Sequence, residues 1–222
     1  MTRMTNYQDL FNKAGEYYAS NREEILPFIP GYVKKTLEFG CGQGDFSVLL
    51  QERLHAETWA VEIHKPSAEV AAKKLHRVFS ADADQAMQDL PNDYFDGIFF
   101  LDLLEHLVNP YELLSKCREK LSPDGVIIAS IPNIRYYRAF VKYVFSGNWE
   151  YQNHGIMDIT HLRFFTYKSI REMFESLEYT IQTLQGLHPT SSKTYFWLNL
   201  ASLNRLWDVR FRHFIVVARK SG

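Results

Sequence analysis

The strongest constraint on the fold of this chain is the regular alternation of short apolar runs with helix-type patterns. The runs predicted as strands are 35–39, 58–63, 77–81, 95–101 and 126–131. The helices predicted between them are 46–54, 67–75 and 110–121. Such alternation is typical of a parallel sheet joined by crossover helices, which predicts an α/β, doubly wound fold. The run 95–101, FDGIFFL, is apolar enough for a central strand that is buried on both faces.

Two stretches, 133–166 and 188–208, interrupt this alternation, and a helix over 167–177 and strands over 179–187 and 212–220 complete it. The chain shows no repeat and no linker, and 222 residues with 46% hydrophobic content suffice for one sizeable core. We therefore predict a single domain, 1–222, in which the two stretches are insertions that cover the sheet.

The strand at 35–39 runs into three alternating glycines, in the sequence KTLEFGCGQGDF. Glycines at 40, 42 and 44 let the backbone pass close beneath a ligand. In a dinucleotide-binding G-x-G-x-x-G motif the third glycine would stand at position 45, where this chain has Asp45. A carboxylate at that helix N-terminus repels a pyrophosphate. The turn therefore favours a phosphate-free ligand.

Two further acids support that interpretation. Glu38 lies two residues before the first glycine and suits a cationic amine or a hydroxyl group. Glu62 lies at the end of the second predicted strand, where a carboxylate commonly accepts both ribose hydroxyls. Together they predict a nucleoside-like ligand without phosphate.

Charge and cysteine content narrow the remaining possibilities. A formal net charge of −1 provides no broad basic field for nucleic acid, so we expect a small-molecule or glycan partner and no nucleic acid. The two cysteines form neither a disulfide framework nor a paired zinc motif. No signal peptide and no run of eighteen apolar residues is present, which predicts a cytoplasmic protein without stable membrane insertion.

Four segments together resemble successive motifs of the class I S-adenosylmethionine-dependent methyltransferases: LEFGCGQGDF, AVEIHKPSAEVAAKKL, ADADQAMQDLPNDYFDGIFFLDLLEHL and LSPDGVIIASIPN. The resemblance covers roughly residues 16–186. YYASNREEILPFIP and GNWEYQNHGIMDITHLRFFT are similar to a bacterial branch associated with glycosyltransferases and surface-polysaccharide biosynthesis. The resemblance implies a Rossmann-like sheet of seven strands in the order 3-2-1-4-5-7-6, with the last strand antiparallel.

The resemblance also implies S-adenosylmethionine as the cofactor, S-adenosylhomocysteine as the product, and a role for each motif residue. Glu38 would contact the methionine part, Glu62 the ribose and Asp82 the adenine amino group. The full implied set is Glu38, Gly40, Cys41, Gly42, Glu62, Ile63, Asp82, Ala83, Leu101 and Asp102. Within it, Cys41 is interpreted as a small space-filling residue and not as a nucleophile.

Transfer of a methyl group to a hydroxyl requires a base, and three residues are candidates: His161, His106 and Asp158. His161 is the first choice, although a buried histidine that only shapes its loop fits the sequence equally well. His106 has the alternative of a helix-start residue packed against the loop, and for its neighbour Glu105 we favour that structural role, stabilised by the helix dipole. No metal is predicted. A metal site formed by His154, Asp158 and His161 is the weaker alternative, because their spacing is irregular and a fourth ligand is not evident.

Residues expected to meet the acceptor lie in the aromatic and basic stretch after residue 133. Trp149 and Tyr151 are predicted acceptor contacts, and Arg163 is predicted to orient substrate or to pin the loop. The interleaved aromatic and basic residues suit an anionic glycan, a lipid-linked acceptor at a membrane surface or a single nucleic-acid strand. The structural alternative is a helix that lays an apolar stripe on the sheet. Two further sets of aromatic residues have either a functional or a core role. Tyr17 and Tyr18 would close over the cofactor or join the core. For Phe196, Trp197 and Trp207 we expect core packing rather than a dimer face or an acceptor pocket.

We therefore expect a methyltransferase that O-methylates a sugar or glycan intermediate. The alternatives are a small-molecule methyltransferase of quinone or secondary metabolism, which predicts a more apolar acceptor cavity, an NAD-binding oxidoreductase, and a non-catalytic binding module. The sequence does not give the oligomeric state.

Overall fold

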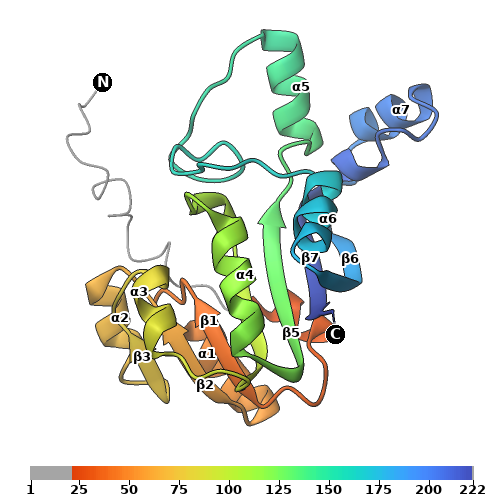
Figure 1. Cartoon of the computed structure of the whole chain (residues 1–222). Coiled ribbons are helices and arrows are strands. Elements are labelled where there is room, and N and C mark those ends of the chain that lie inside the picture. Colours follow the sequence, from red (N-terminus) through yellow and green to blue (C-terminus); the bar gives the residue numbers. More distant parts are fainter. Residues whose placement is uncertain (1–21, 222) are drawn as a thin grey trace.

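The computed structural model describes residues 22–221 and contains one seven-stranded sheet in the order β3-β2-β1-β4-β5-β7-β6 (Figure 1). This order confirms the prediction. Tyr17 and Tyr18 lie outside the described residues. The strands are β1 (Lys35–Phe39), β2 (Glu57–Val61), β3 (Arg77–Phe79), β4 (Phe95–Leu101), β5 (Leu121–Pro132), β6 (Tyr179–Pro189) and β7 (Phe211–Lys220). The first five run parallel, and β7 is antiparallel to both β5 and β6.

Helices lie on both faces of the sheet. The α-helices are α1 (Asp45–Leu54), α2 (Lys65–Ala71), α3 (Ala83–Asp89), α4 (Pro110–Lys120), α5 (Tyr137–Ser146), α6 (Tyr167–Ser176) and α7 (Lys193–Ala201). Short 3-10 turns are η3 (Glu23–Phe28), η4 (Leu104–His106) and η5 (Trp207–Arg210). Apolar residues of α3, α4 and α6 share one core cluster with the strands, whereas those of η3 and α1 belong to a second cluster.

Successive side chains of the central strand β4 point to opposite faces of the sheet and so contribute to both core clusters. Ile98 and Phe100 of β4 belong to the cluster with α4 and α6, and Phe99 between them belongs to the cluster with α1. All three side chains are fully buried. β4 is therefore the central strand, buried on both faces, that its continuous apolar sequence predicts.

Local sequence signals explain where the helices begin. Asn109 accepts a hydrogen bond from the backbone N–H of Glu112 and is followed by proline at the first position of α4. Thr166 and Ser169 form a reciprocal capping box at the start of α6. These caps fix the two helices that cover one face of β4 and β5.

The structure differs from the sequence prediction at several elements. Helix α3 is not predicted, because its residues follow a short strand without clear apolar periodicity. Strand β5 begins at Leu121, since Leu121 pairs with Phe95 before the SPDG turn and the ladder resumes at Val126. The predicted core positions Phe196, Trp197 and Trp207 are wrong, because these side chains are 58%, 65% and 40% exposed.

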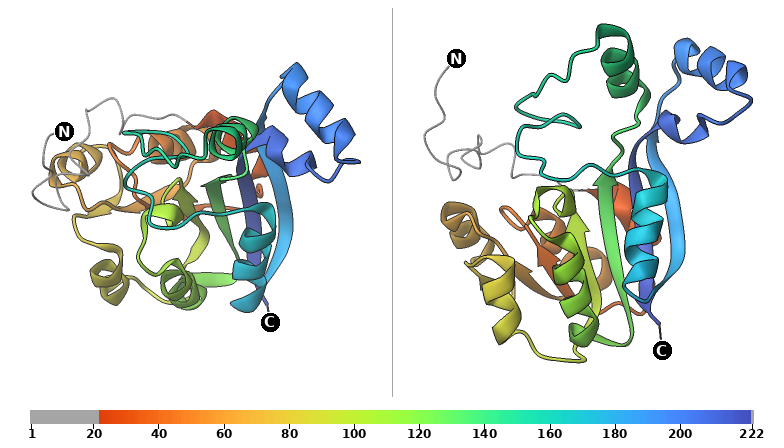
Figure 2. Two further views of the ribbon diagram at one scale, coloured as in Figure 1. Left: turned by 90° about the horizontal axis from the view of Figure 1, so that it is seen from above. Right: turned by 45° about the horizontal axis from the view of Figure 1, so that its top comes forward.

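Helices α5 and α7 both project from the end of the sheet at which β4 and β5 terminate, as two views from different directions agree (Figures 1 and 2). Neither helix has a buried residue. The alternative that α5 packs an apolar stripe on the sheet is therefore wrong, although the segment is helical.

Candidate functional site

The site begins at the glycine turn between β1 and α1. Gly40, Gly42 and Gly44 have φ angles of 71°, 55° and 82°, which lie in the left-handed region that glycine adopts without strain. A Cβ atom at Gly40 would lie 3.0 Å from Leu103 Cδ1. The turn therefore needs glycine both for its backbone conformation and for the close approach of the next loop.

A cavity of about 430 Å³ opens above this turn, at the carboxyl ends of β1, β2 and β4. Its volume falls in the range of small-molecule and cofactor pockets. The lining includes all ten of the residues that the family resemblance assigns to the cofactor: Glu38, Gly40, Cys41, Gly42, Glu62, Ile63, Asp82, Ala83, Leu101 and Asp102. We call this the cofactor cavity.

Glu38 lies at the floor of the cofactor cavity, on β1. Its carboxylate accepts a hydrogen bond of 2.5 Å from the hydroxyl of Ser47 on α1. Burial raises the pKa of this carboxyl to about 7, although the bond from Ser47 opposes that shift. A cationic amine placed beside Glu38 would favour its charged form, so the position fits the amino group of a bound methionine moiety.

Glu62 is held by two backbone N–H groups. Gly42 N donates to Oε2 and His64 N donates to Oε1, each at 2.8 Å. Each carboxylate oxygen has two lone pairs, so each keeps one for a further donor. The carboxylate is therefore oriented to accept from a pair of neighbouring hydroxyls, as the ribose prediction requires.

Asp82 and Asp102 line the same cavity from the ends of two strands. Asp82 caps α3 by accepting a hydrogen bond from Gln85 N at 2.8 Å through one oxygen. Asp102 has a left-handed φ of 53° and pairs with Arg22 at 2.5 Å and with Ser130 Oγ at 3.1 Å. The cavity thus presents several acids and one already paired cation, which suits a cationic, hydroxyl-bearing nucleoside and not a diphosphate.

Cys41 is buried in the turn, and its thiol pKa is raised, chiefly by burial. A protonated, buried thiol is a poor nucleophile. This agrees with the interpretation of Cys41 as a space-filling residue.

A second cavity of about 360 Å³ adjoins the first and shares Arg22, Asp102 and His106 with it. We call it the acceptor cavity. The remaining residues that line it are mostly charged or imidazole side chains: Glu24, Glu105, Pro132, Gly155, Asp158, His161, His188, Arg212 and His213. The lining is polar, unlike the apolar cavity that the quinone alternative predicts.

Two of the predicted bases meet at this junction. His161 Nδ1 lies 3.1 Å from the carbonyl of Ile156, and His106 Nδ1 lies 3.1 Å from the carbonyl of Thr160. A carbonyl only accepts, so Nδ1 carries a proton in each ring, and in the neutral imidazole Nε2 then carries the lone pair. Both imidazoles are therefore held in the tautomer that can take a proton at Nε2.

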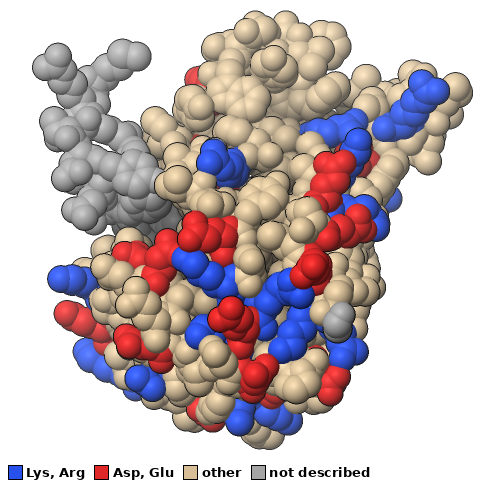
Figure 3. All heavy atoms as spheres, in the orientation of Figure 1, with Lys and Arg blue, Asp and Glu red and all other residues tan. Residues whose placement is uncertain are grey.

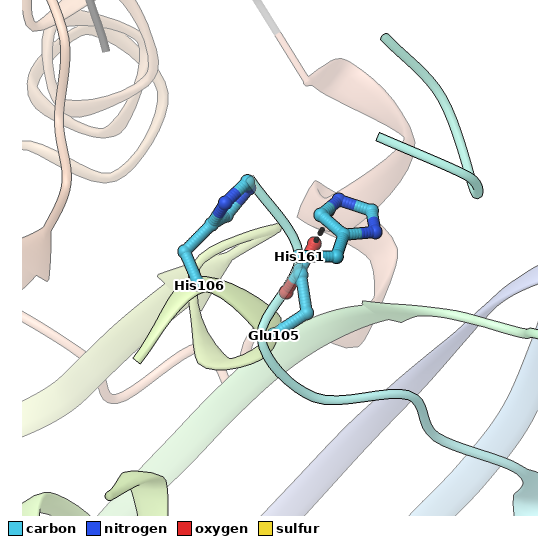
Figure 4. A group of neighbouring side chains, drawn as sticks. All are labelled: Glu105, His106 and His161. Carbon is cyan, nitrogen blue, oxygen red and sulfur yellow. Dashed lines mark ion pairs between the residues drawn. The ribbon is translucent and has the colours of Figure 1, made fainter. Parts of the chain in front are cut away.

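Glu105 stands beneath both rings (Figure 4). Its Oε1 lies 3.9 Å from His161 Nε2, and the side chain is 2% exposed. Within residues 22–221 neither carboxylate oxygen has a hydrogen-bond partner. Burial raises the pKa of Glu105 well above its usual value, and the charge of Asp102 adds to that rise. Glu105 lies in η4, a 3-10 turn of three residues, so the helix dipole expected to stabilise it is absent, whereas its predicted structural, packed position agrees with its burial.

Glu105, His106 and His161 form an acid–imidazole cluster whose ligand-type atoms lie within 4.8 Å of one another. One carboxylate and two imidazoles are a donor set that can hold a divalent cation. The prediction that no metal is present therefore stays a prediction.

The remaining predicted residues take structural positions. Asp158 lines the acceptor cavity, but its carboxylate accepts from the N–H and the hydroxyl of Thr160, at 2.9 and 2.7 Å. Arg163 donates to the carbonyl of Val108 and thereby pins the loop. Trp149 stacks edge-to-face with Tyr143 and Phe164.

Trp149, Tyr151 and Arg163 line neither cavity. Trp149 nevertheless packs on Phe164, whose ring centroid lies 6.4 Å from that of His161, so it lies near the predicted base but outside the acceptor cavity.

Sequence reasoning missed Arg22, His188 and His213. His213 lies 3.6 Å from Asp102, and burial lowers its pKa to about 4. Arg22 is the N-terminal cap of η3, His188 lies on β6 and His213 lies on β7. Only the folded strand order brings these distant segments to one cavity. A lone arginine or histidine in those segments carries no sequence signal of its own.

Comparisons with known proteins identify the family and the fold. The profile of a family described as "Methyltransferase domain" matches residues 10–184. A ubiquinone biosynthesis O-methyltransferase from Actinobacillus pleuropneumoniae is 27% identical over 177 residues, which span 75% of this chain and 74% of that protein. One of the same name from Idiomarina loihiensis is 31% identical over 107 residues, or 45% of this chain and 43% of the relative.

Solved structures share the fold. A SAM-dependent methyltransferase from Archaeoglobus fulgidus superposes with a TM-score of 0.67 at 20% identity, covering 97% of this chain and 100% of the other. The 1,6-didemethyltoxoflavin-N1-methyltransferase of Burkholderia thailandensis, solved with bound 1,6-didemethyltoxoflavin and S-adenosylhomocysteine, superposes with a TM-score of 0.56 at 15% identity. The superposition covers 86% of this chain and 73% of that one. In the part of this chain that the structure describes, no helix is long and apolar enough to cross a membrane.

Proposed function

Since the chain belongs to the methyltransferase domain family and is an S-adenosylmethionine-dependent methyltransferase, we propose that it O-methylates a ring hydroxyl of a small, quinone-type acceptor. The observation that carries this proposal is the meeting of the two cavities at Asp102 and His106. A hydroxyl placed at that junction lies next to the cofactor on one side and next to the acid–imidazole cluster on the other.

When bound, S-adenosylmethionine supplies a methyl group that is already activated by its positively charged sulfur. The contacts of Glu38 and Glu62 support roles toward its ammonium and ribose parts, and the adenine role of Asp82 is what the family resemblance implies. The protein's further task is to align the acceptor oxygen and to remove its proton.

We assign the proton to His161 Nε2. The bond from Nδ1 to Ile156 fixes the ring, so that Nε2 is the basic nitrogen. Once the acceptor proton has moved to Nε2, the imidazolium lies 3.9 Å from Glu105 Oε1, and its positive charge would in turn favour ionisation of that buried carboxyl. His106 shares the junction and is the second candidate for the same role.

The acceptor class rests on the two O-methyltransferase relatives, whose names place them in ubiquinone biosynthesis. One observation favours the sugar or glycan acceptor as a second candidate. The acceptor cavity is lined by acids, histidines and arginines, and such groups suit a polyhydroxylated molecule better than an apolar ring.

The test is an acceptor screen that follows transfer of a labelled methyl group, with catechols and dihydroxybenzoquinones in one arm and nucleotide sugars in the other. The proposal predicts turnover in the first arm, with the methyl group on oxygen. Turnover of sugars alone would replace it with the second candidate. Transfer to nitrogen or carbon alone would overturn O-methylation.

A further inference from the structure

The α7 surface consists of Phe196, Trp197, Leu200 and Leu203. The first three lie on α7, and Leu203 lies in the turn that follows it. The spacing of i, i+1 and i+4 places the first three along one side of the helix, and Leu203 follows in the turn. Their exposed fractions are 58%, 65%, 57% and 83%. Large apolar side chains gathered on one exposed face indicate a binding surface.

Helix α5 adds a second apolar element at the same end of the molecule. Tyr143, Val144 and Phe145 at its tip are 49%, 51% and 78% exposed. Both helices project beyond the end of β5 (Figures 1 and 2). This is also the end of the sheet at which the two cavities open, because their lining residues follow the carboxyl ends of β1, β4 and β5.

The charge of these segments indicates what they meet. Residues 134–149 and 189–206 contain no acidic residue, and their basic residues are Arg135, Arg138, Lys142, Lys193 and Arg205. In Figure 3 the surface over α5 is almost entirely uncharged, and Lys or Arg side chains project near α7. An apolar face with aromatic residues and flanking cations is typical of helices that lie in the interface of an anionic bilayer.

Part of this positive charge is already neutralised within the protein. Arg135 pairs with Asp208 at 3.1 Å, and Lys142 pairs with Glu150 at 2.5 Å. Among residues 22–221 no acid forms an ion pair with Lys193 or Arg205, on either side of the α7 surface. A second copy of the chain would bring the same two cations face to face, whereas anionic lipid headgroups would neutralise them.

We propose that the α7 surface, together with the tip of α5, docks the protein on the surface of an anionic lipid bilayer. The side chains of Trp197 and Leu203 enter the headgroup region, and Lys193 and Arg205 contact the phosphates. This docking is peripheral and goes beyond the methyl-transfer activity, since it depends on no feature of the acceptor.

The experiment is sedimentation of the full chain with vesicles of phosphatidylcholine alone and of phosphatidylcholine mixed equally with phosphatidylglycerol. We expect binding to the mixed vesicles, weakened by high salt, and at least about tenfold weaker binding for Trp197→Glu and Leu203→Glu. Lys193→Gln and Arg205→Gln should each weaken binding roughly fivefold, because each removes one cation near the membrane.

Matched controls separate docking from general effects. Tyr32→Glu changes a 48% exposed aromatic residue before β1, and Lys168→Gln changes an 83% exposed lysine on α6. Both should bind vesicles like the parent protein. Vesicle binding should shift the tryptophan emission of the parent protein to the blue, because Trp197 enters the headgroup region. Trp197→Phe should retain binding but lose most of this blue shift.

Three outcomes would overturn the proposal: no binding to the mixed vesicles, equal binding by the parent and the Glu variants, or self-association that the same variants abolish without vesicle binding. Titration of each variant with S-adenosylhomocysteine confirms that it is folded. The titration also distinguishes failure of the docking proposal from failure of the methyltransferase assignment. A parent protein that binds vesicles but not S-adenosylhomocysteine would refute the methyltransferase function and leave the docking proposal standing.

Discussion

Replacing Glu38 by glutamine should change how the stability of the protein depends on pH. Burial raises the pKa of Glu38 from its ordinary value of 4.5 to about 7, while the hydrogen bond from Ser47 opposes the rise. Below pH 4.5 the carboxyl is protonated in both the folded and the unfolded chain, so it costs nothing. Between pH 4.5 and about 7 only the unfolded chain releases the proton, so the free energy of unfolding falls as the pH rises.

The size of this effect follows from the shift. A difference of about 2.5 pKa units, at about 1.4 kcal/mol each, amounts to about 3 kcal/mol. The Glu38→Gln variant has no proton to release at this position. The free energy of unfolding of the parent protein, relative to the variant, should therefore fall by about 3 kcal/mol from acid to neutral pH.

Urea unfolding of both proteins without ligand, at several pH values across this range, measures the difference. Glu172→Gln, at a 61% exposed side chain on α6, is the control for the same chemical change at the surface. Parallel pH profiles of the parent protein and Glu38→Gln would refute the argument that Glu38 is buried with a raised pKa.

Further substitutions test the base, the turn and the metal. His161→Asn should lower kcat by roughly 10²- to 10⁴-fold and leave S-adenosylhomocysteine affinity unchanged, because His161 lines only the acceptor cavity; equal loss in the control His154→Asn, in the same loop, would contradict this role. Gly44→Ala should lower the free energy of unfolding by about 1–3 kcal/mol, since φ is 82° and the new Cβ would lie 3.1 Å from Leu75 Cδ1. Gly31→Ala, which has no neighbour within 4 Å, is its control, and equal urea midpoints would refute the strain. Chelation with EDTA should leave the methyl-transfer rate unchanged, and a loss that Mg²⁺ or Zn²⁺ restores would show that the acid–imidazole cluster holds a metal.

The fold was predictable because its determinants are local. Strands β1 and β4 have the bounds expected from their apolar runs, and Asn109 with Pro110 marks the start of α4. The three glycines, which were predicted to allow close backbone approach, adopt left-handed φ values in the turn. The strand order itself came from the family resemblance, since periodicity alone indicates only a doubly wound sheet.

The residues of the cofactor cavity were predictable for a related reason. They lie at or shortly after the carboxyl ends of strands β1 to β4, so each is close to a recognisable element. The residues of the acceptor cavity were not predictable in this way, because Arg22, His188 and His213 come from distant segments that meet only in the folded sheet.

Exposure of α7 was also misjudged. Helical spacing of apolar residues indicates one apolar face but not what covers it, and core packing is the usual outcome. Here nothing within residues 22–221 buries Phe196 or Trp197.

The most direct test of the central claim is calorimetric titration with S-adenosylmethionine, S-adenosylhomocysteine and NAD, on the parent protein and on Glu62→Ala. The account predicts micromolar binding of the first two ligands, about −8 kcal/mol, with no binding of NAD. Glu62→Ala should abolish that binding, because it removes the carboxylate that Gly42 N and His64 N orient toward the ribose hydroxyls. Binding of NAD alone, or unchanged affinity in Glu62→Ala, would contradict the assignment of the cofactor cavity.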